Sequence, residues 1–297
     1  ATKLVKMPKR TSSDLEDDGS DVELHESKSK IAYTNKQRVL ILSSRGITAR
    51  YRHLLEDFKK LIPHHKKDNK LDDKGDIHAV NEIADMKSCN QIIYLETRKH
   101  QDLYMYLGKT PDGPSVKFHV VNIHTMDELK LTGNCMLGSR PLLNFDANFE
   151  NTPQLQLMKT LLSEAFGIPM GHPKSKPFND RVMSFFVIKN NIWVRNYQIV
   201  DKSDAGSSGA KKANDTQLVE IGPRFVLIPI RIFNGSLCGA TLYQNPAFVS
   251  PNDERAAFKK KKGDRYVQRT GHMAQRKAFL AENQHPADEL SSKNVFK

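Results

Sequence analysis

The sequence predicts an α/β fold of two related halves, with mixed sheets, flanking helices and charged tails at both ends. Short apolar runs typical of strands alternate with segments whose apolar residues recur at helical spacing. A strand, a polar loop and a helix occur near the start and recur about a hundred residues later. We therefore expect a disordered tail over 1–35, a folded region over 36–252 with halves 36–135 and 136–252, and a basic arm over 253–297.

The net charge of the chain predicts a polyanionic partner. Its 297 residues include 46 Lys and Arg against 34 Asp and Glu, a formal net charge of +12. A chain this basic favours nucleic acid first, and an acidic protein or a membrane surface second. The apolar share of 38% is slightly low for a chain that is folded throughout, which agrees with unfolded tails.

Several classes of protein are not expected. No apolar run approaches the roughly 18 residues that a membrane helix needs, and we find no signal peptide. Cys89, Cys135 and Cys238 match neither a zinc site nor a disulfide framework, so we interpret them as core residues in a reducing compartment. Gly108-Lys109-Thr110 resembles part of a nucleotide-binding loop but lacks its upstream glycine. We predict no metal site and no cofactor.

The folded region begins with a strand, a loop and a helix. Val39 to Leu42 is an apolar run typical of a buried strand, and a polar loop containing Gly46 follows it. The next apolar residues lie on one face of a helix that ends before Pro63; they are Ile47, Tyr51, Leu54, Leu55, Phe58, Leu61 and Ile62. A helix that starts after such a loop directs backbone N–H groups outward, which suits a phosphate.

Cations collect at this junction, and we expect them to contact phosphate groups. The loop and the first turns of the helix carry Ser44, Arg45, Gly46, Arg50, Arg52 and His53. The alternative is that the arginines are only the solvated face of an amphipathic helix.

Further basic segments separate the other elements of the first half. A surface loop over 64–70 carries Lys66 and Lys67, and a corner between two strands carries Arg98 and Lys99. The expected elements are a helix over 77–86 and strands over 92–95, 103–107 and 115–123.

The second half repeats the order of the first. Arg140 precedes an apolar run over 142–145, and a helix is expected between Thr152 as N-cap and Gly167 as stop. A hairpin with strands over 182–188 and 192–200 follows, and then a flexible insertion over 201–215.

Trp193, Arg195 and Tyr197 share one face of the second hairpin strand because side chains alternate along a strand. Aromatic and arginine side chains placed together can stack on bases. Such a triplet more often packs in a core, with only the arginine head in water. We favour packing for the aromatics but keep Arg195 among the candidate RNA-binding residues.

A strand that starts at Leu218 is interrupted by Gly222-Pro223. Glycine allows backbone angles that other residues resist and proline removes an amide donor, so the ladder should break or bulge. Arg224 follows the break, before the apolar run Phe225 to Phe233. The break directs Arg224 to a place that a regular strand would not reach. The alternative is a bulged edge strand whose Arg224 pairs with Glu220 or another acid.

The segment after Pro251 is polar and basic, and we expect it to be helical or disordered. Lys259, Lys260, Lys261 and Lys262 form its densest cluster of charge, which suits RNA phosphates.

Several long segments resemble the Brix-domain family of ribosome assembly factors. The resemblance covers roughly residues 36–252 and rests on Ser43–Ile47, His124–Asp146 and Val219–Val226. Lys99–Leu107 and Leu242–Asn252 point more narrowly to members that act on the large subunit.

This resemblance implies two similar halves, each related to the anticodon-binding fold of some aminoacyl-tRNA synthetases. It implies a nucleolar factor that binds precursor rRNA of the large subunit within the pre-60S particle. The implied protein partner is the homologue of the Epstein–Barr nuclear-antigen-binding protein. In the family a glycine-proline-arginine motif is associated with RNA binding, and here it corresponds to Gly222, Pro223 and Arg224.

Three hypotheses for function follow. The leading one is a non-catalytic RNA-binding assembly factor. The second, an enzyme acting on RNA, lacks support because we find no acidic cluster with metal-ligand spacing, no nucleophile motif and no nucleotide loop. The adjacent Asp127 and Glu128 suit capping or surface charge better than a shared ion. The third is a protein-interaction module whose basic charge serves an acidic partner.

Overall fold

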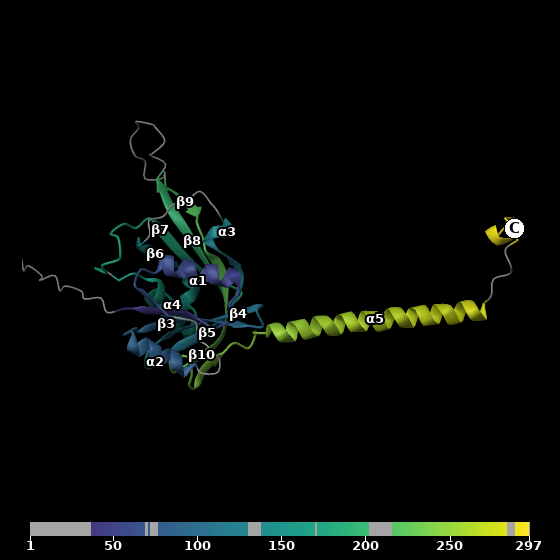
Figure 1. Cartoon of the computed structure of the whole chain (residues 1–297), viewed down its shortest axis with the longest axis horizontal. Coiled ribbons are helices and arrows are strands. Elements are labelled where there is room, and N and C mark those ends of the chain that lie inside the picture. Colours follow the sequence, from purple (N-terminus) through teal and green to yellow (C-terminus); the bar gives the residue numbers. More distant parts are fainter. Residues whose placement is uncertain are drawn as a thin grey trace, which may run out of the picture. The chain divides into compact units, whose positions relative to one another are not determined.

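One mixed sheet organises the part of the chain that the computed structural model describes. The described residues are 37–68, 71, 77–129, 138–169, 171–201, 216–283 and 289–296. Their eleven strands follow the order β2-β1-β3-β4-β5-β10-β8-β7-β6, with β11 paired to β10 and β9 to β8 (Figure 1). The α/β class is therefore confirmed, with most strands antiparallel. The expected tail over 1–35, Cys135 and nearly all of the insertion lie outside the described residues.

The first half contains three parallel strands and an antiparallel meander. Strand β1 pairs in parallel with both β2 and β3, whereas β3, β4 and β5 are antiparallel. The elements are β1 (Val39–Ser43), α1 (Ala49–Leu61), β2 (His65–Lys67), α2 (His78–Met86), β3 (Gln91–Arg98), β4 (Asp102–Lys109), β5 (Ser115–His124) and α3 (Met126–Leu129).

The second half has a similar arrangement. Strands β6 and β7 are parallel, and β7, β8 and β10 are antiparallel. The elements are β6 (Pro141–Phe145), η1 (Ala147–Glu150), α4 (Pro153–Phe166), β7 (Arg181–Ile188), β8 (Asn191–Asp201), β9 (Thr216–Glu220), β10 (Arg224–Phe233), β11 (Thr241–Gln244), α5 (Pro251–Glu282) and α6 (Ser292–Val295). None of the helices in the described part of the chain could cross a membrane, because none is both long and apolar enough.

The two halves meet where β5 pairs with β10. This antiparallel pairing runs from Arg224 opposite His124 to Phe233 opposite Ser115. The halves therefore share one sheet instead of having one each. Their boundary at 135/136 remains our proposal, because residues 130–137 lie outside the described part of the chain.

A single apolar core joins the halves on one face of the sheet. Helices α1 and α4 both contribute to it, as do β1, β3, β4, β5, β7, β8 and β10. The ring of Phe58 on α1 lies 5.8 Å from Phe166 on α4 and 5.5 Å from Phe225 on β10, edge to face in both cases. A second core, to which α2 contributes Val80 and Ala84, includes residues of β1, β3, β4 and β10.

Local sequence signals explain where the second-half elements begin and end. The side-chain oxygen of Thr152 accepts a hydrogen bond from the N–H of Leu155 at 3.4 Å, and Pro153 starts α4. The predicted apolar face of α4 is buried. Lys189 and Asn190 adopt φ of 50° and 64°, which the tight turn between β7 and β8 requires.

One expectation for the first half was wrong. The predicted loop over 64–70 contains β2, which pairs in parallel with the start of β1. Strand β2 joins the sheet at its edge and its lysines are exposed, so backbone bonds define it and no apolar alternation marks it. His64, which the loop would have left exposed, is buried, and burial lowers its pKa to about 4.

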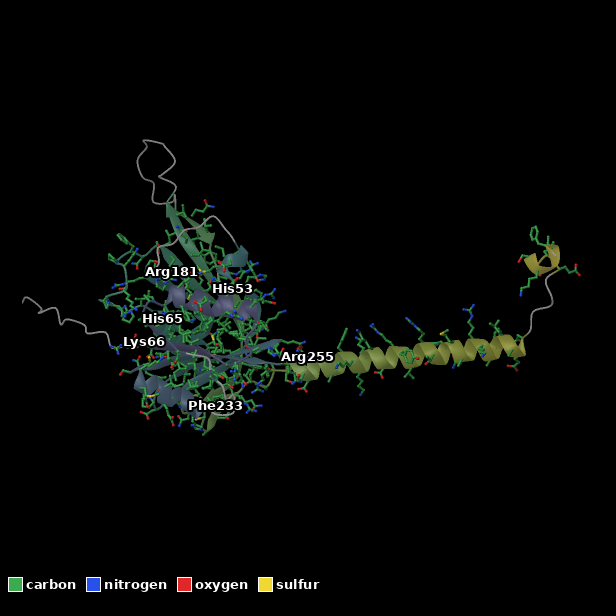
Figure 2. All side chains as sticks on the ribbon, in the orientation of Figure 1. His53, His65, Lys66, Arg181, Phe233 and Arg255 are labelled. Carbon is green, nitrogen blue, oxygen red and sulfur yellow. The ribbon has the colours of Figure 1, made fainter. Side chains whose placement is uncertain are left out.

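Arg181 ties the two halves together from inside. Its side chain, labelled in Figure 2, is 2% exposed. One guanidinium nitrogen donates to the carbonyl of Leu61 at 2.7 Å and to that of Ser139 at 3.1 Å. Leu61 ends α1 in the first half, and Ser139 precedes β6 in the second. The arginine thus satisfies a carbonyl at the C-terminus of α1, where a cation is favoured.

We predict that Phe58→Ala destabilises the folded region by about 3–5 kcal/mol, because it removes a ring packed between the halves. Urea unfolding followed by circular dichroism should show one transition with a lower midpoint. Met86→Ala is the matched control, since Met86 is 78% exposed and its loss should change stability by less than about 0.5 kcal/mol. Two separate transitions, or equal midpoints for the two variants, would contradict a shared core.

Candidate nucleic-acid interface

The predicted break in the strand ladder lies between β9 and β10. Both strands pair with β8, with Glu220 opposite Tyr197 and Phe225 opposite Val194. Between them, the N–H of Ile221 donates to the carbonyl of Asn196 at 3.0 Å. The buried side chain of Asn196 donates to the carbonyl of Gly222 at 2.9 Å. Asn196 thus provides hydrogen-bond partners for the backbone on both sides of the interruption, at Ile221 and at Gly222.

The backbone angle at Gly222 explains why a glycine occurs at this break. Its φ of +73° lies in the left-handed region that side chains disfavour. A Cβ at this position would also lie 2.7 Å from Cδ1 of Leu129. The following peptide bond, to Pro223, is cis. This backbone leads directly into Arg224, the first residue of β10.

Two arginines share one carboxylate beside the break. Nη1 of Arg224 lies 3.7 Å from Oε2 of Glu220, and Nη1 of Arg195 lies 3.1 Å from the same oxygen. The alternative in which Arg224 pairs with Glu220 is therefore observed. One carboxylate cannot neutralise two guanidinium groups, so the site keeps a surplus positive charge. The side chains of Arg224 and Arg195 are 35% and 31% exposed, so an incoming anion can reach both.

The arginines line a surface pocket of about 250 Å³. Its walls also include Trp193, Val226, Asn122 and His124. A second pocket of about 470 Å³ shares Asn122 and His124 and extends towards α1 and the start of α5. The end of β5 therefore connects the cations of the break with those of the first half.

The loop after β1 and the corner between β3 and β4 lie together. The hydroxyl oxygen of Ser44 accepts a hydrogen bond from the N–H of Thr97 at 2.9 Å, and Nδ1 of His100 bonds the carbonyl of Gly46 at 2.8 Å. Arg45 is exposed next to this contact. Ser44 is 0% exposed, so its side chain serves the fold and is not available to a phosphate.

Acids of α3 face basic side chains of α1. Arg50 lies 3.3 Å from Glu128 and His53 lies 3.3 Å from Asp127. His124 of β5 is also 3.3 Å from Glu128. All five side chains are well exposed, so such pairs are weak and a phosphate can replace the carboxylate. Arg52, in contrast, is exposed and makes no ion pair with a residue that the structure describes.

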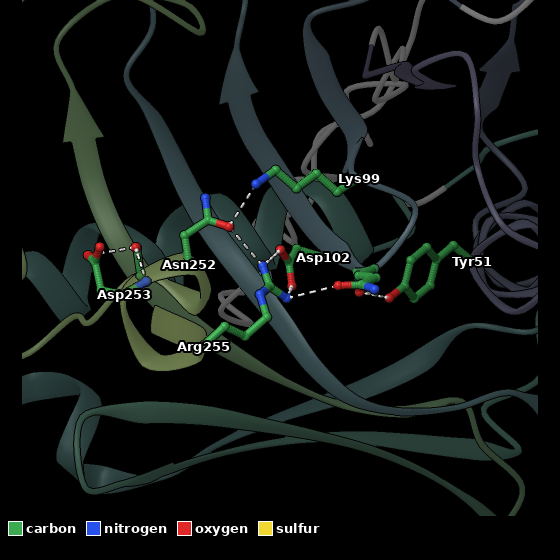
Figure 3. A network of polar contacts seen from close by, with 8 residues as sticks. Tyr51, Lys99, Asp102, Asn252, Asp253 and Arg255 are labelled. Atoms are coloured by element: carbon green, nitrogen blue, oxygen red, sulfur yellow. Dashed lines mark hydrogen bonds and ion pairs between the residues drawn. The ribbon is translucent and has the colours of Figure 1, made fainter. Parts of the chain in front are cut away.

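A polar network attaches the start of α5 to the first half (Figure 3). The guanidinium of Arg255 binds both carboxylate oxygens of Asp102, at 3.0 and 2.5 Å. It also contacts Oδ1 of Asn252 at 3.1 Å, and Nζ of Lys99 reaches the same oxygen at 3.2 Å. Tyr51 of α1 joins the network through the carbonyl of Gln101, to which its hydroxyl donates at 2.6 Å. The predicted corner cation Lys99 is therefore part of this attachment.

The rest of α5 is an exposed basic helix (Figure 2). Between Arg255 and Ala281 it carries nine Lys or Arg and one acid, Asp264. Lys or Arg recurs every seventh residue, at 255, 262, 269 and 276, and seven residues are almost two helical turns. One side of the helix therefore presents a line of cations. The predicted cluster Lys259 to Lys262 is exposed within it.

Some predicted residues lie apart from these pockets. Lys66 and Lys67 belong to β2 and pair with the start of β1, whereas the Ser44 loop follows its end. Arg140 precedes β6, which is separated from β10 by β7 and β8. Arg98 is engaged within the fold, with its Nε 2.8 Å from Glu96 and its guanidinium over the Tyr104 ring.

Sequence reasoning missed three residues of this surface. The predicted strand over 115–123 includes Asn122 but ends before His124, and neither residue is given a role there. Arg255 is not distinguished within the predicted basic arm. Only the pairing of β5 with β10 and the contact with Asp102 reveal them. No group of three or more His, Cys, Asp or Glu in the described part of the chain could hold a metal ion.

Comparisons with known proteins show what this chain is similar to. A model of the Brix domain matches residues 44–231. Ribosome biogenesis protein BRX1 of Saccharomyces cerevisiae is 47% identical over 265 residues, which cover 89% of this chain and 91% of the yeast protein. The human BRX1 homolog is 51% identical over 227 residues, which cover 76% of this chain and 61% of the human protein. The crystal structure of a probable ribosomal biogenesis protein from Aeropyrum pernix K1 matches 64% of this chain and 95% of its own, with a TM-score of 0.41 and 15% identity.

The geometry at Gly222 predicts opposite effects of two Gly→Ala substitutions. Gly222→Ala should destabilise the folded region by about 1–2 kcal/mol, because φ is positive and the end of the Leu129 side chain must move to admit the new methyl group. Gly263→Ala in α5 meets no atom within 4 Å and should raise helix content, since alanine favours a helix by roughly 0.5–1 kcal/mol. Urea unfolding tests the first effect and far-ultraviolet circular dichroism the second. Loss of stability in both variants, or in neither, would contradict this assignment.

The buried carboxylate of Asp57 on α1 predicts that the stability of the folded region depends on pH. Its carboxylate is 1% exposed and accepts a hydrogen bond from the N–H of Met126 at 2.9 Å. Burial raises the pKa of Asp57 from 3.8 to about 6. The folded state therefore holds this proton more tightly than the unfolded state does. The stability that Asp57 contributes is complete below about pH 4 and is lost as the pH rises through 6.

Asp57→Asn removes this titration while keeping an oxygen for Met126. Relative to the wild type, the variant should gain up to about 3 kcal/mol between about pH 4 and about pH 7.5. Urea unfolding at both pH values measures the gain. A difference between the proteins that stays constant with pH would show that Asp57 does not titrate as described.

Proposed function

This chain belongs to the Brix domain family, and we propose that it is a non-catalytic ribosome biogenesis factor that binds precursor rRNA. The family match over 44–231 and the relatives that are named ribosome biogenesis proteins support the biogenesis role. We further propose that it acts in the nucleolus, on the large (60S) subunit and within the pre-60S particle, as the sequence resemblance implies.

One observation carries the proposal of RNA binding: basic side chains from three strands and two helices surround adjoining pockets. Arg195, Arg224 and His124 lie at the break, and Arg50 and Arg255 lie beside the second pocket. Basic side chains around open pockets bind phosphate oxygens without reading sequence. Glu220, Asp102 and Glu128 pair with these arginines, and Glu254 also lines the second pocket. The surplus of positive charge therefore lies at the break, where Arg195 and Arg224 share Glu220.

The chemistry of the pockets supports binding without catalysis. Their histidines are His119 and His124, and neither lies beside a serine, cysteine or threonine that could act as a nucleophile in the described pockets. The described residues also lack a carboxylate cluster for a metal ion. We therefore propose that RNA is held and not cleaved.

A second candidate function, a protein-interaction scaffold, is favoured by an apolar groove along α4. Pro114, Pro153, Leu157 and Leu161 line this pocket of about 350 Å³. From the family resemblance, the partner we propose is the homologue of the Epstein–Barr nuclear-antigen-binding protein. The two functions are compatible, because this groove and the cationic pockets share no lining residue.

The exposed lysines of α5 predict the salt dependence of RNA binding. Binding should weaken linearly with the logarithm of salt concentration, by a slope of about −0.7 for each single-strand phosphate neutralised. Changing Lys259, Lys260, Lys261 and Lys262 to Gln should make the slope shallower by at most about 3 units. Fluorescence anisotropy with labelled single-stranded RNA at several salt concentrations measures it.

The matched control changes the same four lysines to Arg, which keeps the charge and should keep the slope. The RNA should be recovered intact from every titration. An equal slope in the Gln and Arg variants would remove α5 from the interface, and cleaved RNA would contradict the proposal of binding alone.

A further inference from the structure

We propose that the sheet face formed by β7, β8, β10 and β5 binds an unpaired RNA nucleotide, with its base stacked on Trp193. This inference rests on the proposed RNA binding and specifies the form of RNA that this face accepts. It replaces the interpretation of Trp193 as a core residue.

Strand register places an apolar row beside a cationic row. Trp193 lies opposite Phe186 on β7 and Val226 on β10, and Val226 lies opposite Val121 on β5. Two residues further along β8 and β10, Arg195 lies opposite Ser184, and Arg224 lies opposite His124, where the register between β10 and β5 shifts. Partner residues in a sheet point to the same face, and residues two apart along a strand do so as well. Aromatic and cationic side chains are therefore neighbours on one surface.

The opposite face of these strands is occupied by the core. Ile192 and Val194 of β8 pack there with Phe185 and Phe225, under α1 and α4. Because side chains alternate, Trp193, Arg195 and Arg224 point away from these helices. The core that α2 helps to form contains no residue of β7 or β8. Within the described part of the chain, Trp193 is half-buried and lines an open pocket instead of a core.

The chemistry of this pocket matches one nucleotide. An indole ring offers a flat surface on which any base can stack, and sheets that present aromatic side chains bind single-stranded RNA in this way. Arg195 and Arg224, one strand apart, can hold the phosphates on either side of that base. Asn122 and His124 supply donors and acceptors for a base edge. A base inside a duplex has both faces covered, so this site should exclude paired RNA.

The occupant we propose is RNA and not an acidic peptide. The surplus charge beside the break attracts either of them. A half-buried indole next to that charge, in a pocket with amide and imidazole groups, favours a planar aromatic ring joined to phosphate.

Trp193 is the only tryptophan of the chain, so its fluorescence reports on this site alone. The full chain should be titrated with a single-stranded oligoribonucleotide, with the same sequence as a duplex, with inorganic polyphosphate and with a poly-glutamate peptide. We expect saturable quenching by the single strand only. Polyphosphate should compete for the cations without quenching the indole.

Two variants of Trp193 distinguish the loss of stacking from a loss of folding. Trp193→Leu should weaken single-strand binding roughly 5- to 150-fold, the range for loss of one stacked base. Trp193→Phe keeps an aromatic ring and should retain most of the affinity. Circular dichroism spectra that match the wild type confirm that each variant is folded.

The outcomes separate this inference from the proposed function. If RNA binds with the expected salt dependence but leaves Trp193 fluorescence unchanged, and Trp193→Leu binds normally, the stacking site is wrong and RNA binding stands. Equal quenching by duplex would also overturn the inference, as would quenching by poly-glutamate alone. If no RNA binds at all, the proposed function itself fails.

Discussion

The antiparallel pairing of β5 with β10 is the constraint on which the rest of this structure depends. It joins two strand–helix–strand units into one sheet and allows α1 and α4 to share a core around Phe58. It also sets Arg224 opposite His124, so that a cation of the second half lies next to the end of the first. Without this pairing, each half would expose a strand edge and the candidate site would be divided.

The break at Gly222-Pro223 gives the shared sheet its polar site. A continuous strand would carry its side chains past Glu220 in regular alternation. The interruption instead brings the guanidinium of Arg224 close to the carboxylate of Glu220, which Arg195 also contacts. Asn196 compensates for part of the lost ladder bonds, because it provides partners for the N–H of Ile221 and the carbonyl of Gly222. A positive site is thus held rigidly at the junction of the two halves.

Much of the fold could be predicted because it depends on local patterns. Residues close together in the sequence determine the periodicity of α1 and α4, the turn at Lys189 and Asn190, and the break at Gly222. Strand β2 could not be predicted, because an exposed edge strand is defined by backbone bonds to a distant partner. The contacts of Arg181 with Leu61 and Ser139 are hidden for the same reason. The exposure of Trp193 could not be predicted either, because alternation gives the two faces of a strand but not the side that the helices cover. Likewise, the ion pair between Arg255 and Asp102 joins residues that lie 153 positions apart.

Cross-linking of the chain to RNA in purified pre-ribosomal particles, mapped to both residue and nucleotide, tests the central claim most directly. The claim is that cations and an aromatic ring at the junction of a duplicated sheet hold RNA without altering it. It predicts cross-links at Trp193 and around Arg224, to intact and unpaired nucleotides of precursor rRNA. Cross-links confined to distant surfaces such as β2, with the β8–β10 face covered by protein, would contradict it.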